Sequence, residues 1–186
     1  MSADFIRYGK VALRVVDDTD SDIGFINDAL NSEKMRPYMG RMRPLTVEEE
    51  RKRINEQTDD GGLYLLVTVN GDRVGAVSLI PQWEQQNNYE LTIWLIPEAR
   101  GNGYGTEVTK AVVNHAFEYL DCQRISAHLW EDNELSRSLL ESVGFLLEGE
   151  KRSGWRWEGE YRNNLYYGLT REDWEEQQSL FRERED

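Results

Sequence analysis

The sequence has little cysteine and histidine, and it has no long apolar run. Cys122 is the one cysteine, so the chain cannot form an internal disulfide, and with only His115 and His128 beside it no metal-ligand cluster is visible. No apolar run approaches the length of a membrane span, and Met1–Asp4 lacks a signal-peptide pattern. We therefore expect a cytoplasmic protein that binds no metal and no membrane.

Positive charge is also scarce. The formal net charge is -13, which argues against binding to the phosphates of DNA or RNA. Lysine is rare among the basic residues, and an acid-rich, lysine-poor composition predicts a halophilic-type protein, in which salt screens surface charge. The alternative is an acidic surface that attracts a cationic substrate such as a basic peptide or a polyamine.

The 186 residues and their 39% hydrophobic content predict a single domain (1–186), with a core of about 11–174 and a charged tail at 175–186. We expect strands at 10–16, 63–69, 73–80, 89–96, 124–129 and 161–169, with an Asn-Gly hairpin signal at 70–71. We expect 145–150 and 155–157 to belong to one long strand or hairpin arm. We expect helices at 20–31, 46–58, 134–142 and 171–184, and a long central helix that ends near residue 120. Thr46 and Glu49 form a capping-box pattern, and helix 134–142 is expected to bury Leu135, Leu139 and Val143. This order predicts an α/β (mixed α+β) fold of about seven strands with helices on both faces of the sheet.

The chain is organised around a strand, a glycine-rich turn and the central helix. The strand ends at Pro97, and Arg100–Gly105 follows with three alternating glycines. The helix is expected to bury Val108, Ala111, Val112, Ala116, Tyr119 and Leu120. Bare backbone N–H groups at the start of a helix suit a phosphate, although a tight turn without a ligand has the same pattern.

Two signatures resemble those of one enzyme superfamily. Arg100–Gly105 is similar to the pyrophosphate loop Q/R-x-x-G-x-G/A of the GNAT N-acetyltransferases. Asn133-Glu134-Leu135-Ser136, followed by Val143-Gly144-Phe145, resembles the second GNAT signature at the expected spacing. The ending 166–174 resembles the ribosomal-protein alanine/serine N-terminal acetyltransferases, and the whole resemblance covers roughly residues 11–174.

The resemblance implies a GNAT-type acyl-CoA N-acyltransferase fold in which two central strands splay apart. It implies acetyl-CoA as cosubstrate and an amine as acceptor, either a protein N-terminus or a small amine such as a polyamine, amino acid or antibiotic. A non-catalytic CoA-binding sensor is the alternative from another class, and a homodimer stays open. The implied cofactor-binding residues are Ile93, Trp94, Leu95, Arg100, Gly101, Asn102, Gly103, Tyr104, Gly105, Thr106 and Asn133.

The catalytic residues implied by the resemblance are Glu90 and Ser136. Glu90 starts the central strand, where a carboxylate can take the proton of the attacking amine. Many members place a tyrosine beside the departing thiolate, but Leu140 occupies that position here. The ribosomal branch instead uses a serine that corresponds to Ser136, whose hydroxyl can stabilise the thiolate. Trp155 stands where the ribosomal branch has a glutamate, so Trp155 and Trp157 are expected to line the acceptor pocket, with core packing as the alternative.

Three further side chains have competing interpretations. Asn133 can cap the following helix as well as contact the cofactor. His115 and His128 are expected to be hydrogen-bonded core histidines rather than bases. The basic segment 32–44 is expected to be an irregular solvated loop, with a flap over the acceptor or a contact with cofactor phosphates as the alternative.

Overall fold

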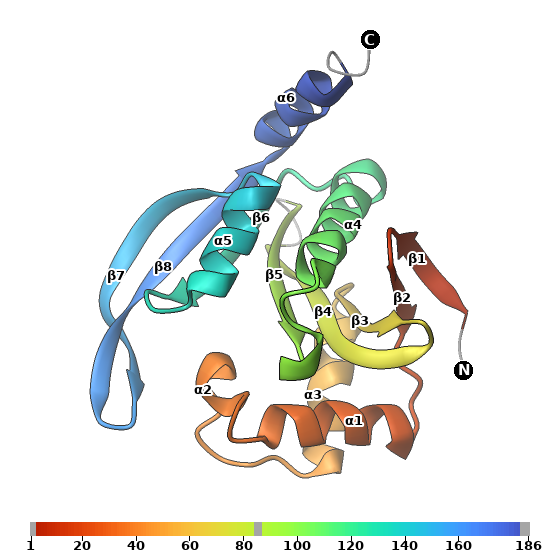
Figure 1. Cartoon of the computed structure of the whole chain (residues 1–186), viewed down its shortest axis with the longest axis vertical. Coiled ribbons are helices and arrows are strands. Elements are labelled where there is room, and N and C mark those ends of the chain that lie inside the picture. The colour runs from red at the N-terminus through yellow and green to blue at the C-terminus, as the bar shows by residue number, and fades with distance from the viewer. Residues whose placement is uncertain (1–2, 84–86, 183–186) are drawn as a thin grey trace. The chain divides into compact units, whose positions relative to one another are not determined.

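The computed structural model describes residues 3–83 and 87–182, which contain eight strands and six α-helices (Figure 1). The strands are β1 (Asp4–Tyr8), β2 (Val11–Val15), β3 (Leu63–Val69), β4 (Asp72–Trp83), β5 (Asn88–Leu95), β6 (Arg124–Trp130), β7 (Leu146–Trp157) and β8 (Glu160–Thr170). The helices are α1 (Asp20–Asn31), α2 (Arg36–Met39), α3 (Val47–Asp59), α4 (Tyr104–Tyr119), α5 (Glu134–Val143) and α6 (Arg171–Arg182), with a 3-10 helix η2 (Pro97–Ala99) before α4. Parallel and antiparallel pairs both occur, which confirms the predicted mixed α/β class. Across these described ranges, no helix has the length and apolar character needed to cross a membrane.

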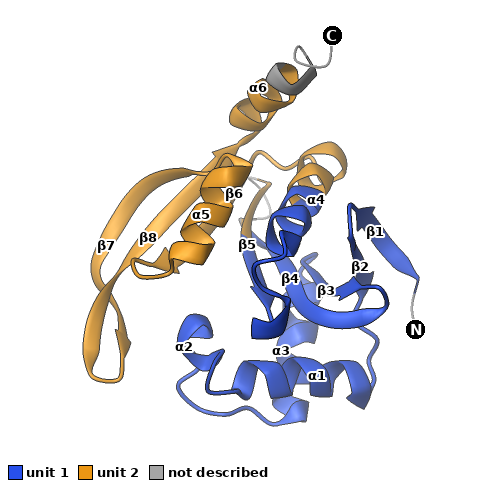
Figure 2. Cartoon of the chain, in the orientation of Figure 1, with its two compact units in different colours: residues 1–81, 91–112 blue, residues 82–90, 113–186 orange. Residues whose placement is uncertain are grey.

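The chain forms two compact units, which Figure 2 shows in blue and orange. Unit 1 contains residues 1–81 and 91–112, and unit 2 contains residues 82–90 and 113–186. The division falls within β5 and within α4. Each of these two elements therefore contributes residues to both units.

Unit 1 is built on an antiparallel ladder in the order β1-β2-β3-β4, with β5 next to β4. The turn between β3 and β4 has positive φ angles at Asn70 (52°) and Gly71 (90°), as the Asn-Gly hairpin signal predicts. Helices α1 and α3 cover buried residues of the ladder because their apolar side chains recur at helical spacing. The core of this unit includes Ile23, Ile26, Leu30, Ile54, Tyr64, Leu66 and Trp94.

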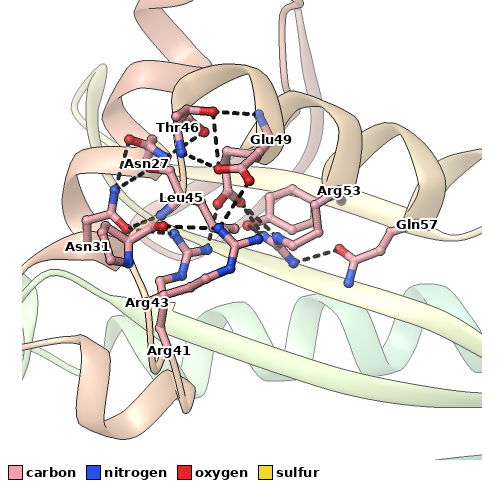
Figure 3. A network of polar contacts seen from close by, with 12 residues as sticks. Asn27, Asn31, Arg41, Arg43, Leu45, Thr46, Glu49, Arg53 and Gln57 are labelled. Carbon is pink, nitrogen blue, oxygen red and sulfur yellow. Dashed lines mark hydrogen bonds and ion pairs between the residues drawn. The ribbon is translucent and has the colours of Figure 1, made fainter.

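A polar network fixes the start of α3 (Figure 3). The Glu49 N–H donates to the Thr46 hydroxyl (3.2 Å) and the Thr46 N–H donates to the Glu49 carboxylate (2.8 Å), which confirms the predicted capping box. The side-chain amides of Asn27 and Asn31 on α1 donate to the carbonyl of Leu45 (2.9 and 2.8 Å). The backbone just before α3 is therefore held against α1 by side chains.

Arginines of the segment before α3 bind acidic side chains of that helix. Glu50 is fully buried and accepts from Arg41 (2.5 Å) and from Arg53 (2.5 Å), and Arg43 donates to Glu49 (3.0 Å). The Arg41 side chain is 9% exposed. The segment 32–44 also contains the short helix α2, which the sequence pattern did not indicate. Arg41 is thus part of a docked segment, and its guanidinium is not turned to solvent.

Unit 2 has the strand order β5-β6-β8-β7, with β6 antiparallel to β8 and β8 antiparallel to β7. Successive side chains point to opposite faces, so the odd-numbered residues of β6 and β8 share one face. That face is buried, and its side chains are Ile125, Ala127, Leu129, Leu165, Tyr167 and Leu169. The other face is called the indole face below. By register it holds Glu90, Ser126, His128, Trp130, Trp155, Trp157, Asn164 and Tyr166.

The parallel ladder between β5 and β6 is short. It pairs residues 88–90 with residues 124–126, and in the described part of the chain no further pair follows Glu90 and Ser126. This early end of the ladder agrees with the predicted splayed pair of central strands.

The structure differs from the sequence prediction in several places. Strand β1 was not predicted because its residues are mostly exposed and carry no burial pattern, so the fold has eight strands rather than about seven. Tyr119 (73% exposed) was expected in the core, but it lies in the last turn of α4. Leu135 (68% exposed) was also expected to be buried, but α5 buries the neighbouring stripe with Leu140 and Val143. Helix α6 reaches residue 182, and the last two residues of the predicted helix lie outside the described ranges.

Candidate active site

The glycine-rich turn of unit 1 joins η2 to α4 through an unusual backbone. Gly101 and Gly103 have φ angles of 76° and 81°, and a Cβ atom at either position would meet nothing within 4 Å. Glycine is therefore required here by the left-handed conformation and not by crowding. The Glu107 N–H makes the first bond of the helical ladder, to the Gly103 carbonyl (3.1 Å), so the N–H groups of residues 104–106 have no helical acceptor. This open, amide-rich turn fits a phosphate group.

The polar side chains of the turn stabilise the turn itself. Arg100 donates from Nε to the Leu95 carbonyl (3.1 Å) and from Nη2 to the Met35 sulfur (2.7 Å), and its guanidinium lies 5.4 Å from the centre of the Tyr38 ring. The Asn102 side-chain amide donates to the carbonyls three and two residues before it (3.3 and 3.1 Å). Of the predicted cofactor-binding groups in this turn, the backbone amides remain available.

Strand β5 offers its backbone rather than its side chains. Trp94 is 6% exposed and belongs to the core of unit 1, whereas Ile93 and Leu95 are half-buried. The Ile96 N–H donates to a β4 carbonyl (2.9 Å), and backbone groups alternate in direction along a strand. The N–H and C=O groups of Ile93 and Leu95 therefore point away from β4. The Leu95 carbonyl already accepts from the turn, which leaves the backbone of Ile93.

Glu90 lies beside a histidine in unit 2. Its Oε1 is 3.4 Å from Nδ1 of His128, and the two side chains are 30% and 41% exposed. Tyr166 is paired with His128 across the strands, with ring centroids 6.0 Å apart. His128 was expected in the core, but it is exposed on the indole face because even-numbered residues of β6 point there. A carboxylate, an imidazole and a phenol thus meet on one accessible surface.

The second predicted signature forms the start of α5. The Asn133 side-chain oxygen accepts from the Ser136 N–H (3.2 Å), so Asn133 is the N-cap, one of the two roles expected for it. Ser136 is half-buried, and its hydroxyl takes no part in this cap. Leu140, four residues later, is 4% exposed and packs in the core.

The two tryptophans predicted to contact substrate lie on the indole face, around a third. The Trp130 ring centroid is 5.1 Å from that of Trp155 and 6.4 Å from that of Trp157. All three rings are half-buried, so they form a cluster of which part remains accessible. The sequence analysis did not single out Trp130. Its position at the end of β6, beside two tryptophans of β7, follows from the pairing of both strands with β8.

The remaining reactive side chains are unsuited to nucleophilic or metal chemistry. Cys122 is fully buried, and loss of hydration raises the pKa of its thiol to about 11; the thiol donates to the Arg124 carbonyl (3.2 Å). His115 is half-buried and stacks on Tyr119 at 5.3 Å, and burial lowers its pKa. Within residues 3–83 and 87–182, no three histidine, cysteine or acidic side chains gather as metal ligands.

Comparison with known proteins identifies the family. Residues 10–146 match the family model of the acetyltransferase (GNAT) domain. The chain belongs to the GNAT acetyltransferase family. It is therefore an acyltransferase with acetyl-CoA as cosubstrate, as the two sequence signatures predicted.

Curated GNAT relatives differ in the acceptor that their names give. "Putative ribosomal N-acetyltransferase YdaF" of Bacillus subtilis is 29% identical over 120 residues, which are 64% of this chain and 66% of the relative. Spermidine N(1)-acetyltransferase of Escherichia coli is 26% identical over 114 residues, which are 61% of this chain and 60% of the relative. The chain thus matches just under two thirds of the length of these two relatives. Both kinds of acceptor are amines.

Solved structures support the fold of this GNAT chain. The spermidine N-acetyltransferase of Vibrio cholerae in complex with CoA and spermine superposes with a TM-score of 0.80. The match covers 89% of this chain and 98% of that protein, at 21% sequence identity. At this identity the likeness concerns the fold alone.

Proposed function

We propose that this GNAT enzyme transfers the acetyl group of acetyl-CoA directly to a primary amine, and that the acceptor is a protein N-terminus of the ribosomal-protein type. The pair formed by Glu90 and His128 supports this proposal most strongly, because it is an accessible proton acceptor on β5. The ammonium form of an amine has no lone pair, so a group that removes its proton is needed before attack. Glu90 takes that proton directly or through a water molecule, and His128 orients the carboxylate.

The turn and β5 supply the cofactor side of the proposed site. The backbone amides from Gly101 to Thr106 hold the pyrophosphate, since the turn is open and lacks helical acceptors. The backbone of Ile93 hydrogen-bonds the pantetheine arm. Glu90 lies three residues before Ile93 in the sequence of the same strand. One strand can therefore serve both the arm and the proton acceptor.

The proposed reaction needs no covalent enzyme intermediate. The neutral amine attacks the thioester carbon, the C–N bond forms, and the nitrogen gives up its second proton to water. The C–S bond breaks as the thiolate leaves. Ser136 donates a hydrogen bond to that thiolate, which then takes up a proton from solvent. Cys122 takes no part, because its buried thiol remains protonated at neutral pH.

A small amine such as a polyamine is the second candidate acceptor. The Escherichia coli relative named for spermidine supports it, as does the net charge of -13. A screen with labelled acetyl-CoA separates the two candidates. Acetylation of peptides with free N-termini supports the first, and acetylation of polyamines alone supports the second.

Glu90→Gln tests the proton acceptor with little change of shape. We expect kcat/KM to fall by about 10²–10⁴-fold, because the amide cannot accept a proton. Glu118→Gln on the exposed side of α4 is the control. Ser136→Ala is compared with Ser138→Ala, an exposed serine of the same helix, and only the first should slow transfer. Undiminished turnover of Glu90→Gln across pH would remove Glu90 from this role.

A further inference from the structure

Two polar atoms of the indole face are buried and have no hydrogen-bond partner among the residues that the structure describes. One is the side-chain oxygen Oδ1 of Asn164, a residue that is 6% exposed. The other is the indole Nε1 of Trp155. Buried polar groups in proteins are almost always paired, so each such atom calls for an explanation. Neither atom is used by the proposed proton acceptor.

Both residues border Trp130. Asn164 is the cross-strand partner of Trp130, and the Trp155 ring lies 5.1 Å from the Trp130 ring. A Cβ atom at Gly154 would lie 3.2 Å from the Cβ of Asn164, so β7 passes close to this asparagine. Asn164, with an unpaired acceptor, and Trp155, with an unpaired donor, therefore both neighbour the same indole ring.

This set of groups selects a ligand with a donor and an acceptor of its own. The indole N–H can only donate, and the amide oxygen of Asn164 can only accept. A polyamine presents donors alone and leaves the indole N–H unpaired, whereas a carboxylate presents acceptors alone. A peptide bond presents both an N–H and a C=O, and its plane can stack on an indole ring.

We propose that Asn164 and Trp155 bind a peptide bond of the acceptor, with the Asn164 oxygen accepting its N–H and the Trp155 indole donating to its C=O. This inference rests on the proposed function and selects the N-terminus of a polypeptide over a polyamine. His128 and Trp130 are two residues apart on β6, about 7 Å. An extended peptide advances about 3.5 Å per residue. The recognised bond is therefore one of the first three after the reactive amine.

An ester scan of a peptide substrate tests the inference on the unchanged protein. Each of the first three peptide bonds of a tetrapeptide with a free N-terminus is replaced in turn by an ester, which lacks the N–H. We expect one ester to lower kcat/KM about tenfold. Equal rates for all three esters and the parent peptide would overturn the inference.

Two variants test whether the effect of the ester depends on Trp155 and Asn164. Trp155→Phe removes the indole N–H together with part of the ring, and Asn164→Leu replaces the amide by an apolar group with the same branching. Each variant should lower kcat/KM for the peptide about tenfold and leave kcat/KM for a simple alkylamine unchanged. In Asn164→Leu, the ester that slows the wild type should react as fast as the parent peptide, because the acceptor of that N–H is already absent. Equal losses for peptide and alkylamine would contradict a role in peptide recognition.

The outcomes separate this inference from the proposed function. Acetylation of polyamines but of no peptide would overturn the inference and leave the enzyme an amine acetyltransferase. Absence of transfer to any amine, with CoA still bound, would overturn the proposed function itself.

Discussion

The glycine-rich turn gives the sharpest test of the cofactor site. Gly103 has a φ of 81°, and a Cβ atom added there would have no neighbour within 4 Å, so alanine meets no clash. The remaining cost is the left-handed backbone of a residue with a Cβ, about 1–2 kcal/mol. Without a ligand, the variant avoids this energetic cost because its turn can relax to another conformation. CoA binding requires the original conformation, so the cost reduces the binding free energy and Gly103→Ala should bind CoA about 5–30-fold more weakly.

Calorimetric titration with CoA measures this effect. Gly149→Ala in β7 is the matched control, because its Cβ also meets nothing within 4 Å and its φ is not in the left-handed region. The control should bind CoA like the wild type. If Gly103→Ala also binds CoA like the wild type, with its helix content unchanged by circular dichroism, the turn does not hold the cofactor in the way proposed.

Two further predictions concern stability. Glu50→Gln removes the buried negative charge beside Arg41 and Arg53 and should lower the free energy of unfolding in urea by about 3–5 kcal/mol. Exposed Glu48→Gln should change it little, and equal stabilities of the two variants would contradict this reasoning. Burial acts to raise the pKa of Asp22, but hydrogen bonds, first that from Arg14 (2.6 Å), outweigh it and lower the pKa. Its stabilisation is present above the ordinary pKa of about 3.9 and is lost as pH falls through the folded-state value. The difference in free energy of unfolding between wild type and Asp22→Asn should therefore shrink as the pH falls through the folded-state pKa of Asp22. A difference that stays constant with pH would count against the ion pair of Arg14 and Asp22.

Much of the fold could be predicted from local patterns. Thr46 and Glu49 specified a helix start through their own hydrogen bonds, and Asn70-Gly71 specified a hairpin through backbone conformations that few other pairs adopt. Strand β1 carried no such signal, because an edge strand with mostly exposed residues lacks a burial pattern. In α5 two apolar stripes competed, and only packing decides which of them is buried. The single-domain prediction remains a prediction.

The candidate site was less predictable than the fold. Glu90 and the glycine-rich turn could be named from the sequence, because their signals lie within a few neighbouring residues. His128 meets Glu90 only through the register of β5 against β6, and Asn164 meets Trp130 only through the register of β6 against β8. Neither register can be read from one strand alone. The alternation of Ile125 and Ala127 with polar neighbours was the one available hint that His128 faces away from the core.

In the turn before α4, the arginine and asparagine side chains hydrogen-bond to nearby backbone carbonyls, and the main-chain amides remain available for a ligand. The indole face, by contrast, presents side chains. If the proposed roles hold, substitutions change the acceptor-binding side chains more readily than the coenzyme-binding main chain. A protein engineer could retarget such a catalyst by editing a few aromatic and amide positions, with no need to rebuild its donor chemistry.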